Sequence, residues 1–96
     1  MTIETSHFDA ADYLGDSEAQ AAFIEAAFET GDAAYVARAL GVVARAQGMT
    51  KVATEAGVTR EALYKALSEN GDPRLSTFFG VAKALGLKIT AVSATT

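Results

Sequence analysis

Cysteine is absent from this 96-residue sequence, and histidine and proline each occur once. Without cysteine the chain has no disulfide framework, thiol nucleophile or cysteine-based zinc site, and it fits a reducing cytoplasm. The single histidine, His7, lies in an N-terminal stretch without hydrophobic period, and no metalloprotease, nucleophile-elbow or phosphate-loop motif is present. The apolar runs are broken by charge within about ten residues, well below the roughly twenty that cross a bilayer. We therefore expect no enzyme, no metal or cofactor site, no signal peptide and no membrane span.

Lysine and arginine are absent from residues 1–37, which contain eight acidic residues and thus carry a formal charge of −8. Residues 38–96 contain all eight Lys and Arg against four acids, a formal +4. The net charge of −4 therefore hides a basic half. A basic half suits a nucleic-acid binder, whereas the acidic half would be repelled by DNA. Two oppositely charged surfaces suggest two partners.

Hydrophobic residues at helical spacing predict helices over most of the chain. Asp9 begins a short helix over residues 9–14, and a helix over residues 18–30 follows, with a possible capping box of Ser17 and Gln20. Asp32 caps a longer helix that ends near residues 47–48, and Gly41 inside it marks a close helix crossing. The inward residues of the 18–30 helix are predicted to be Ala19, Ala22, Phe23, Ala26 and Ala27.

Residues 49–68 predict two short helices joined by a tight turn at Gly57, where the backbone needs positive φ. Thr50 is expected to cap the first helix, over residues 51–56, and Thr59 the second. The short link forces a steep crossing, which the small Ala53 allows. This spacing is the helix-turn-helix pattern, and an ordinary helical hairpin is the alternative. The seven fitting positions are Val52, Ala53, Ala56, Gly57, Val58, Leu63 and Ala66.

The second helix of this pair keeps a polar outward face of residue types that hydrogen-bond phosphates and base edges in the major groove. It is therefore the candidate recognition helix. Arg45 is either a solvated arginine, like Arg38 on the same face, or a phosphate contact just before the motif. The DNA-binding candidates are Arg45, Thr50, Lys51, Thr59, Arg60, Glu61, Tyr64, Lys65, Ser68 and Arg74.

A last helix and a strand are predicted after the polar loop 69–73, which holds the only proline. Residues 87–92 alternate and are rich in β-formers, which predicts a strand without a partner in the chain. Such a strand stays frayed, begins a disordered tail or pairs across a two-fold axis to give a dimer through Leu87, Ile89 and Ala91. The helix stops at Gly86, and its expected core stripe is Leu75, Phe78, Phe79, Ala82 and Leu85.

From about residue 8 to residue 92 the chain resembles the addiction-module antidote proteins, helix-turn-helix antitoxins related to the HigA type. The resemblance rests on ALGVVARAQGMT at residues 39–50, AGVTREALYKALS at 56–68 and AKALGLKI at 82–89, together with the acidic N-terminal helices. The last two also recur in phage-repressor-like domains. Arg74 departs from the pattern, because a small polar helix cap is more usual there.

The resemblance implies a five-helix, lambda-repressor-like domain that binds a basic RelE/HigB-like toxin, a small ribonuclease, and represses the shared operon. The predicted fold is thus all-α, a single domain over residues 1–96. It has acidic N-terminal helices at 1–31, a repressor-like helix-turn-helix core at 32–86 and a short C-terminal β-strand at 87–92. A homodimer on double-stranded operator DNA is expected. The toxin-binding candidates are Asp12, Asp16, Glu18, Glu25 and Glu29.

Other functions compete with this one. A stand-alone prophage-type repressor would need about sixty residues, so the acidic block would then simply complete the core. An adaptor that has lost DNA binding would be favoured if Glu61 prevents the second helix of the motif from binding DNA. An enzyme has the least support, because the carboxylates lie on predicted exposed helix faces without a pocket to shift their pKa.

Overall fold

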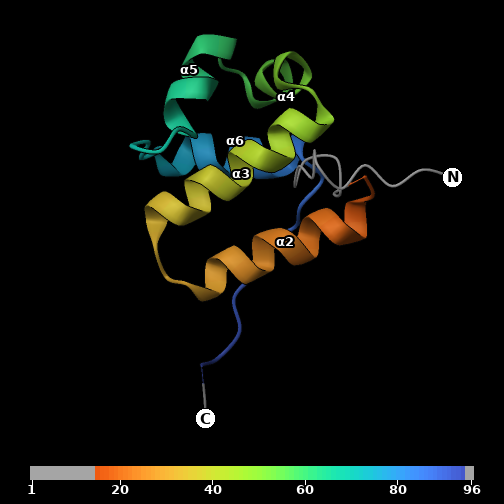
Figure 1. Ribbon diagram of the computed structural model, residues 1–96, viewed down its shortest axis with the longest axis vertical. Coiled ribbons are helices and arrows are strands. Elements are labelled where there is room, and N and C mark those ends of the chain that lie inside the picture. Colours follow the sequence, from red (N-terminus) through yellow and green to blue (C-terminus); the bar gives the residue numbers. More distant parts are fainter. Residues whose placement is uncertain (1–14, 95–96) are drawn as a thin grey trace, which may run out of the picture.

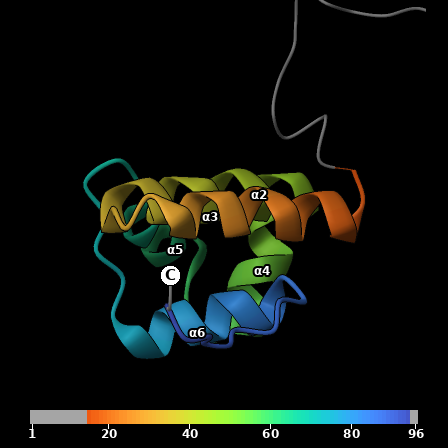
Figure 2. The same ribbon diagram turned by 90° about the horizontal axis from the view of Figure 1, so that it is seen from below.

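The computed structural model describes residues 15–94, which form five helices and no strand. Figure 1 shows α2 and α3 side by side in antiparallel orientation, with α5 on the far side of α3 from α2. In Figure 2 the α2–α3 layer lies over α6. The all-α prediction is confirmed for this part of the chain, and the predicted helix 9–14, with Asp12, lies outside it. The helices are α2 (Ser17–Glu29), α3 (Ala33–Gln47), α4 (Met49–Ala56), α5 (Arg60–Ala66) and α6 (Leu75–Ala84).

Three helices begin at a side-chain cap, and two of these caps were predicted. Asp32 accepts hydrogen bonds from the backbone N–H groups of residues 34 and 35, and Thr59 accepts one from residue 62 at 3.0 Å. The prediction of a Ser17 cap for α2 was wrong, because the extended Asp16 takes that place. Its Oδ1 accepts from the Ala19 N–H at 2.7 Å. A carboxylate is favoured there because it also faces the positive end of the helix dipole.

The predicted Thr50 cap of α4 was also wrong. The helix already begins at Met49, and the preceding Gly48 has a φ of 112° and provides no side-chain cap. Met49 is buried in the core, so the packing of its side chain draws it into the first turn. Thr50 consequently stands exposed inside the helix, with its hydroxyl not used as a cap.

The core lies between α3, α4, α5 and α6, and α2 closes one side of it. The predicted inward face of α2 was partly wrong: Ala22 and Ala26 are exposed, whereas Gln20 and Ile24 are buried. Ile24 buries far more apolar surface than an alanine, and its position sets the rotation of the helix. The largest fully buried side chains are Leu40, Val43, Val52, Leu63 and Val81.

The predicted core stripe of α6 is buried only over its second half. Of its predicted residues Ala82 and Leu85 are buried and Phe78 is half-buried, but Leu75 is 68% exposed and Phe79 49% exposed. For Leu75 and Phe79 the prediction of a core position was wrong, because only one face of the N-terminal half of α6 contacts the rest of the protein.

Glycine allows two close helix contacts. A Cβ on Gly41 would lie 3.1 Å from the carbonyl oxygen of Leu67, so α3 and the end of α5 approach closely, as predicted. A Cβ on Gly80 would lie 3.1 Å from the carbonyl oxygen of Ala56, which places α6 directly against the end of α4. A side chain at either position would push these helices apart.

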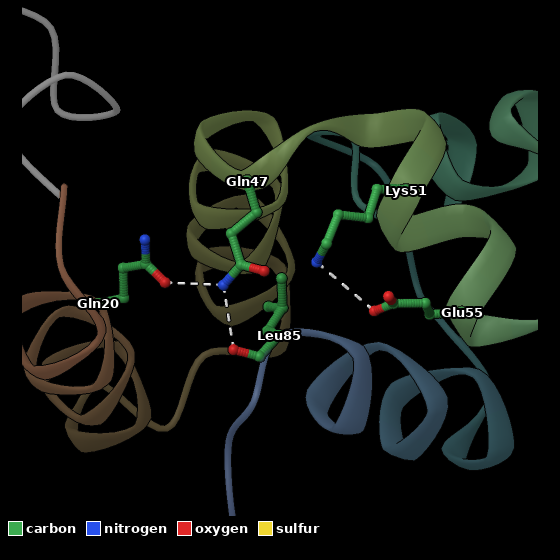
Figure 3. A network of polar contacts seen from close by, with 5 residues as sticks. All are labelled: Gln20, Gln47, Lys51, Glu55 and Leu85. Atoms are coloured by element: carbon green, nitrogen blue, oxygen red, sulfur yellow. Dashed lines mark hydrogen bonds and ion pairs between the residues drawn. The ribbon is translucent and has the colours of Figure 1, made fainter.

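A partly buried amide network fastens α2 to the rest of the fold (Figure 3). The side-chain amide of Gln47, at the end of α3, donates to Oε1 of Gln20 at 2.7 Å and to the carbonyl oxygen of Leu85 at 3.0 Å. One side chain therefore links α2, α3 and the end of α6. The acidic helix is in this way an integral part of the packed structure.

The C-terminal segment does not form the predicted strand: residues 87–94 have no regular secondary structure. Gly86 takes a φ of 82° and reverses the chain, so that the Leu87 N–H donates to the Ala82 carbonyl at 2.9 Å. Leu87 and Ile89 are half-buried, while Lys88 and Thr90 are exposed. The alternation that predicted a strand thus comes from an irregular segment beside α2, in which Leu87 and Ile89 turn toward the protein.

Candidate functional site

The turn between α4 and α5 places the exposed face of α5 away from the core. Gly57 ends α4 with a φ of 78°, and the Val58 N–H donates back to the Ala53 carbonyl at 3.0 Å. Val58 packs on the core as a half-buried side chain, and Thr59 then caps α5. The turn is therefore fixed by a left-handed glycine, a hydrophobic contact and a hydroxyl cap.

Arg60 is the centre of a polar cluster on this face. Its guanidinium donates to Oγ1 of Thr50 at 3.2 Å and to the hydroxyl of Tyr64 at 3.4 Å, and it lies 5.5 Å from the centre of the Tyr64 ring. The hydrogen bond with Tyr64 is the main cause that raises the pKa of Arg60 above its ordinary value. The exposed and permanently charged guanidinium of Arg60 thus connects α4 to α5 through its hydrogen bonds. The sequence had placed all three residues on one surface but had not indicated that they bond.

The other polar residues predicted on this face are exposed, and several have local partners. The Thr59 hydroxyl is used as the helix cap, and the Ser68 hydroxyl donates to the Lys65 carbonyl at 2.9 Å. Lys51 forms an ion pair with Glu55 at 3.6 Å along α4 (Figure 3). Glu61 and Lys65 are exposed in the first and last turns of α5.

Two predicted residues stand apart from the Arg60 cluster. The Arg45 guanidinium folds back along α3, and Arg45 borders a hollow of about 470 Å³ together with Arg38 and Ser68. It therefore lies toward the end of α5 and not toward its start. Arg74 immediately precedes α6, is exposed and does not cap that helix with its side chain.

The acidic residues predicted on α2 form a separate surface. Glu18, Glu25 and Glu29 are exposed. Within residues 15–94 the one ion pair joins Lys51 to Glu55, so these three carboxylates have no cationic partner there. Asp16 is partly engaged as the cap of α2, and Asp12 lies outside the described residues. In Figure 1 this helix and α5 are on opposite sides of α3.

No metal or membrane site is found in the part of the chain that the structure describes. Residues 15–94 contain no group of three or more His, Asp or Glu side chains that could hold a metal ion. None of their helices combines the length and the apolar character that a bilayer span requires.

Over residues 15–94 these observations define a class of helical protein. It has a polar arginine cluster on one side and, on the other, an acidic helix without a cationic partner in that part of the chain. Residues 4–93 match a family model described as "probable addiction module antidote protein". The chain therefore belongs to this antidote family, whose members act on a toxin partner, and the resemblance found in the sequence is confirmed. An uncharacterized protein of Haemophilus influenzae is 38% identical over 88 residues, covering 92% of this chain and 91% of the relative. No solved structure is significantly similar.

Proposed function

We propose that this antidote protein neutralises a basic RelE/HigB-like toxin and represses its own operon by inserting α5 into the major groove of operator DNA. The observation that carries the proposal is the exposed guanidinium of Arg60, held between Thr50 on α4 and Tyr64 on α5. Arginine presented from the start of a recognition helix suits the bidentate acceptors of guanine. The antidote acts in the cytoplasm, without catalysis or a cofactor.

The arrangement of α4 and α5 supports a helix-turn-helix of the lambda-repressor type. The left-handed Gly57, the half-buried Val58 and the buried Ala53 and Leu63 occupy the positions that such a motif needs. A plain helical hairpin would need the same glycine but not a charged cluster on the outer face of the second helix.

The proposed DNA contacts divide into base and phosphate contacts. Arg60 and Tyr64 approach base edges, while Lys65 and Lys51 approach phosphates. Arg45 and Arg74 are proposed as outer phosphate contacts, because they stand apart from the cluster. Hydroxyls at positions 50, 59 and 68 and the carboxylate of Glu61 complete the proposed surface.

We propose that the acidic helix α2 attracts the toxin electrostatically before the two proteins come into contact. A surface with Glu18, Glu25 and Glu29 unpaired, on the side of α3 away from α5, draws a cationic protein and keeps DNA at the opposite side. Because α2 joins the same core and amide network as α3 and α6, we treat residues 1–96 as one domain.

A homodimer is proposed as the DNA-binding form, since a palindromic operator needs two recognition helices about 34 to 36 Å apart. The Leu87 side chain packs against its own core, so pairing between chains would start beyond it, with Ile89 and Ala91. Residues 88–92 have no regular secondary structure and are mostly exposed, which leaves them accessible to a second chain.

A stand-alone prophage-type repressor is the alternative. The deciding experiment measures fluorescence anisotropy of the chain on DNA from its own upstream region, with and without the purified product of the adjacent gene. Antitoxin function requires specific DNA binding, a stable complex with that product and rescue of growth on co-expression. DNA binding without complex formation would favour the lone repressor, and a complex without DNA binding would favour an adaptor.

A further inference from the structure

Three phenylalanine rings and a leucine on α2 and α6 form an apolar surface, in which Phe28, Leu75 and Phe79 are exposed and Phe78 is half-buried. The ring centroids of Phe28 and Phe78 are 6.2 Å apart, and those of Phe78 and Phe79 are 5.5 Å apart. Leu75 is 68% exposed beside them. Single exposed apolar residues are ordinary, but a contiguous group with a polar rim is typical of an interaction site.

This surface borders an open hollow of about 450 Å³. Its inner wall consists of Val36, Ala37 and Leu40 of α3, and Phe28, Leu75 and Phe78 line its sides. The hollow is wide enough for apolar side chains of a partner. Buried anchor residues in such pockets carry most of the binding energy of protein interfaces.

The rim of the hollow is acidic. Asp32 and Asp72 line it, without a lysine or arginine among its described lining residues, whereas Glu25 and Glu29 border the neighbouring hollow, which also has Phe28 in its lining. A second copy of the chain docked here by two-fold symmetry would bring these carboxylates close to their own counterparts, which is unfavourable. A cationic partner meets the same rim with complementary charge.

We propose that this hollow is where the toxin is anchored: an apolar side chain of a cationic toxin enters between Phe28, Leu75 and Phe78, and basic residues around it meet the rim carboxylates. The inference rests on the proposed basic character of the toxin. It assigns different kinetic roles to two surfaces. The acidic helix mainly accelerates association, and the apolar hollow mainly slows dissociation.

Leu75→Ser is the direct test, because a residue this exposed can be changed with little effect on the fold. Binding is measured by surface plasmon resonance with the purified product of the adjacent gene. We expect dissociation at least about 30-fold faster with an association rate close to the parent's. Leu75→Met, which keeps an apolar side chain, should restore slow dissociation.

Tyr35→Ser is the matched control. Tyr35 is 45% exposed on α3, and it borders the other hollow, next to Arg38. Its replacement removes an exposed aromatic ring without touching the Phe28–Phe78 surface, so toxin dissociation should not change. Asp72→Asn should instead slow association at low salt and leave dissociation nearly unchanged. Circular dichroism and operator binding verify the fold of each variant.

Three results would overturn the inference. If Leu75→Ser and Leu75→Met both dissociate from the toxin like the parent, the hollow is not the anchor. If Leu75→Ser converts a dimer into monomers in sedimentation while toxin binding is intact, a second copy occupies the hollow. If the parent itself does not bind the adjacent gene product, the proposed toxin partner fails as well, and this outcome is separable from the first two because it appears before any substitution.

Discussion

Arg60, at the start of α5, donates a hydrogen bond of 3.2 Å to the hydroxyl of Thr50 on α4. The bond crosses the turn between the two helices at the protein surface. An arginine has five N–H donors, so this bond and the one to Tyr64 leave donors free for a base edge. Because the side chain is already oriented, less conformational freedom is lost when it binds.

The first prediction concerns this arginine. Arg60→Ala should weaken specific operator binding by about 1 to 3 kcal/mol and relax the choice of base at one position, because a bidentate guanine contact is lost. Fluorescence anisotropy with a set of operators substituted at single base pairs measures both effects. Arg60→Lys should retain much of the non-specific affinity but lose discrimination, since an ammonium lacks the planar fork.

Thr50 provides a finer control for the same prediction. Thr50→Val removes the acceptor with little change in shape, and Thr50→Ser retains it. The valine variant should therefore lose part of the discrimination that the serine variant preserves. Unchanged affinity and selectivity in Arg60→Ala, with an intact circular dichroism spectrum, would rule out the groove assignment.

A second prediction separates phosphate contacts from base contacts. Lys65 is exposed in the last turn of α5 and takes no part in the hydrogen bonds that join Arg60 to Thr50 and Tyr64. Lys65→Ala should weaken binding to all DNA sequences alike and reduce the slope of log affinity against log salt by about one. A sequence-dependent loss would instead place Lys65 against a base. Titrations at several salt concentrations on operator and unrelated DNA distinguish the two.

The parts of the fold that local rules determine could be predicted from the sequence. Asp32 and Thr59 are good caps in any chain, and Gly57 is needed wherever a short turn requires positive φ. Gly41 inside a helix pattern correctly indicated a close crossing. Each inference used only residues within a few positions of one another.

The errors concern features that distant parts of the chain decide. Alanines occur all around α2, so the sequence pattern could not show that Ile24 determines the buried face. The spacing of Leu75 and Phe79 predicted an apolar stripe but not how far α6 is covered by its neighbours. For the candidate site, the sequence placed Thr50 and Arg60 on one surface. Their hydrogen bond depends on the angle at which α4 and α5 cross, and this angle cannot be predicted from a local sequence pattern.

A third prediction compares two polar interactions by their burial. Gln47→Ala removes the donor to Gln20 and to the Leu85 carbonyl in a partly buried place, and should lower the free energy of unfolding by about 1 to 3 kcal/mol. Glu55→Gln breaks only the exposed ion pair with Lys51 and should cost at most about 0.5 kcal/mol. Urea unfolding followed by circular dichroism measures both. Equal losses would show that the amide network does not hold α2 in place.

A fourth prediction tests the proposed dimer. Removal of residues 88–96 leaves Leu87, which packs on the core and bonds to the Ala82 carbonyl, and should yield monomers in analytical ultracentrifugation. Removal of residues 93–96 alone is the control and should leave the dimer. An unchanged dimer mass in the longer truncation would move the interface to a helical face.

The last prediction concerns the acidic helix. Replacing Glu18, Glu25 and Glu29 together by Lys should slow association with the toxin several-fold, and more at low salt, because exposed charges act mainly on the encounter rate. The fold should survive, since all three side chains are exposed, and DNA binding should not weaken. Stopped-flow measurements at several ionic strengths provide the association rates.

The matched control makes the same change of charge on the other half of the chain, at Glu55, Glu61 and Glu69, which are also exposed. If only the total charge of the protein mattered, toxin association would slow equally in both triple variants. A local acidic docking face would slow it much more when the lysines are on α2. If the α2 variant associates with the toxin and neutralises it as well as the parent does at every salt concentration, α2 is simply a solvated face, and toxin recognition must lie elsewhere on the molecule.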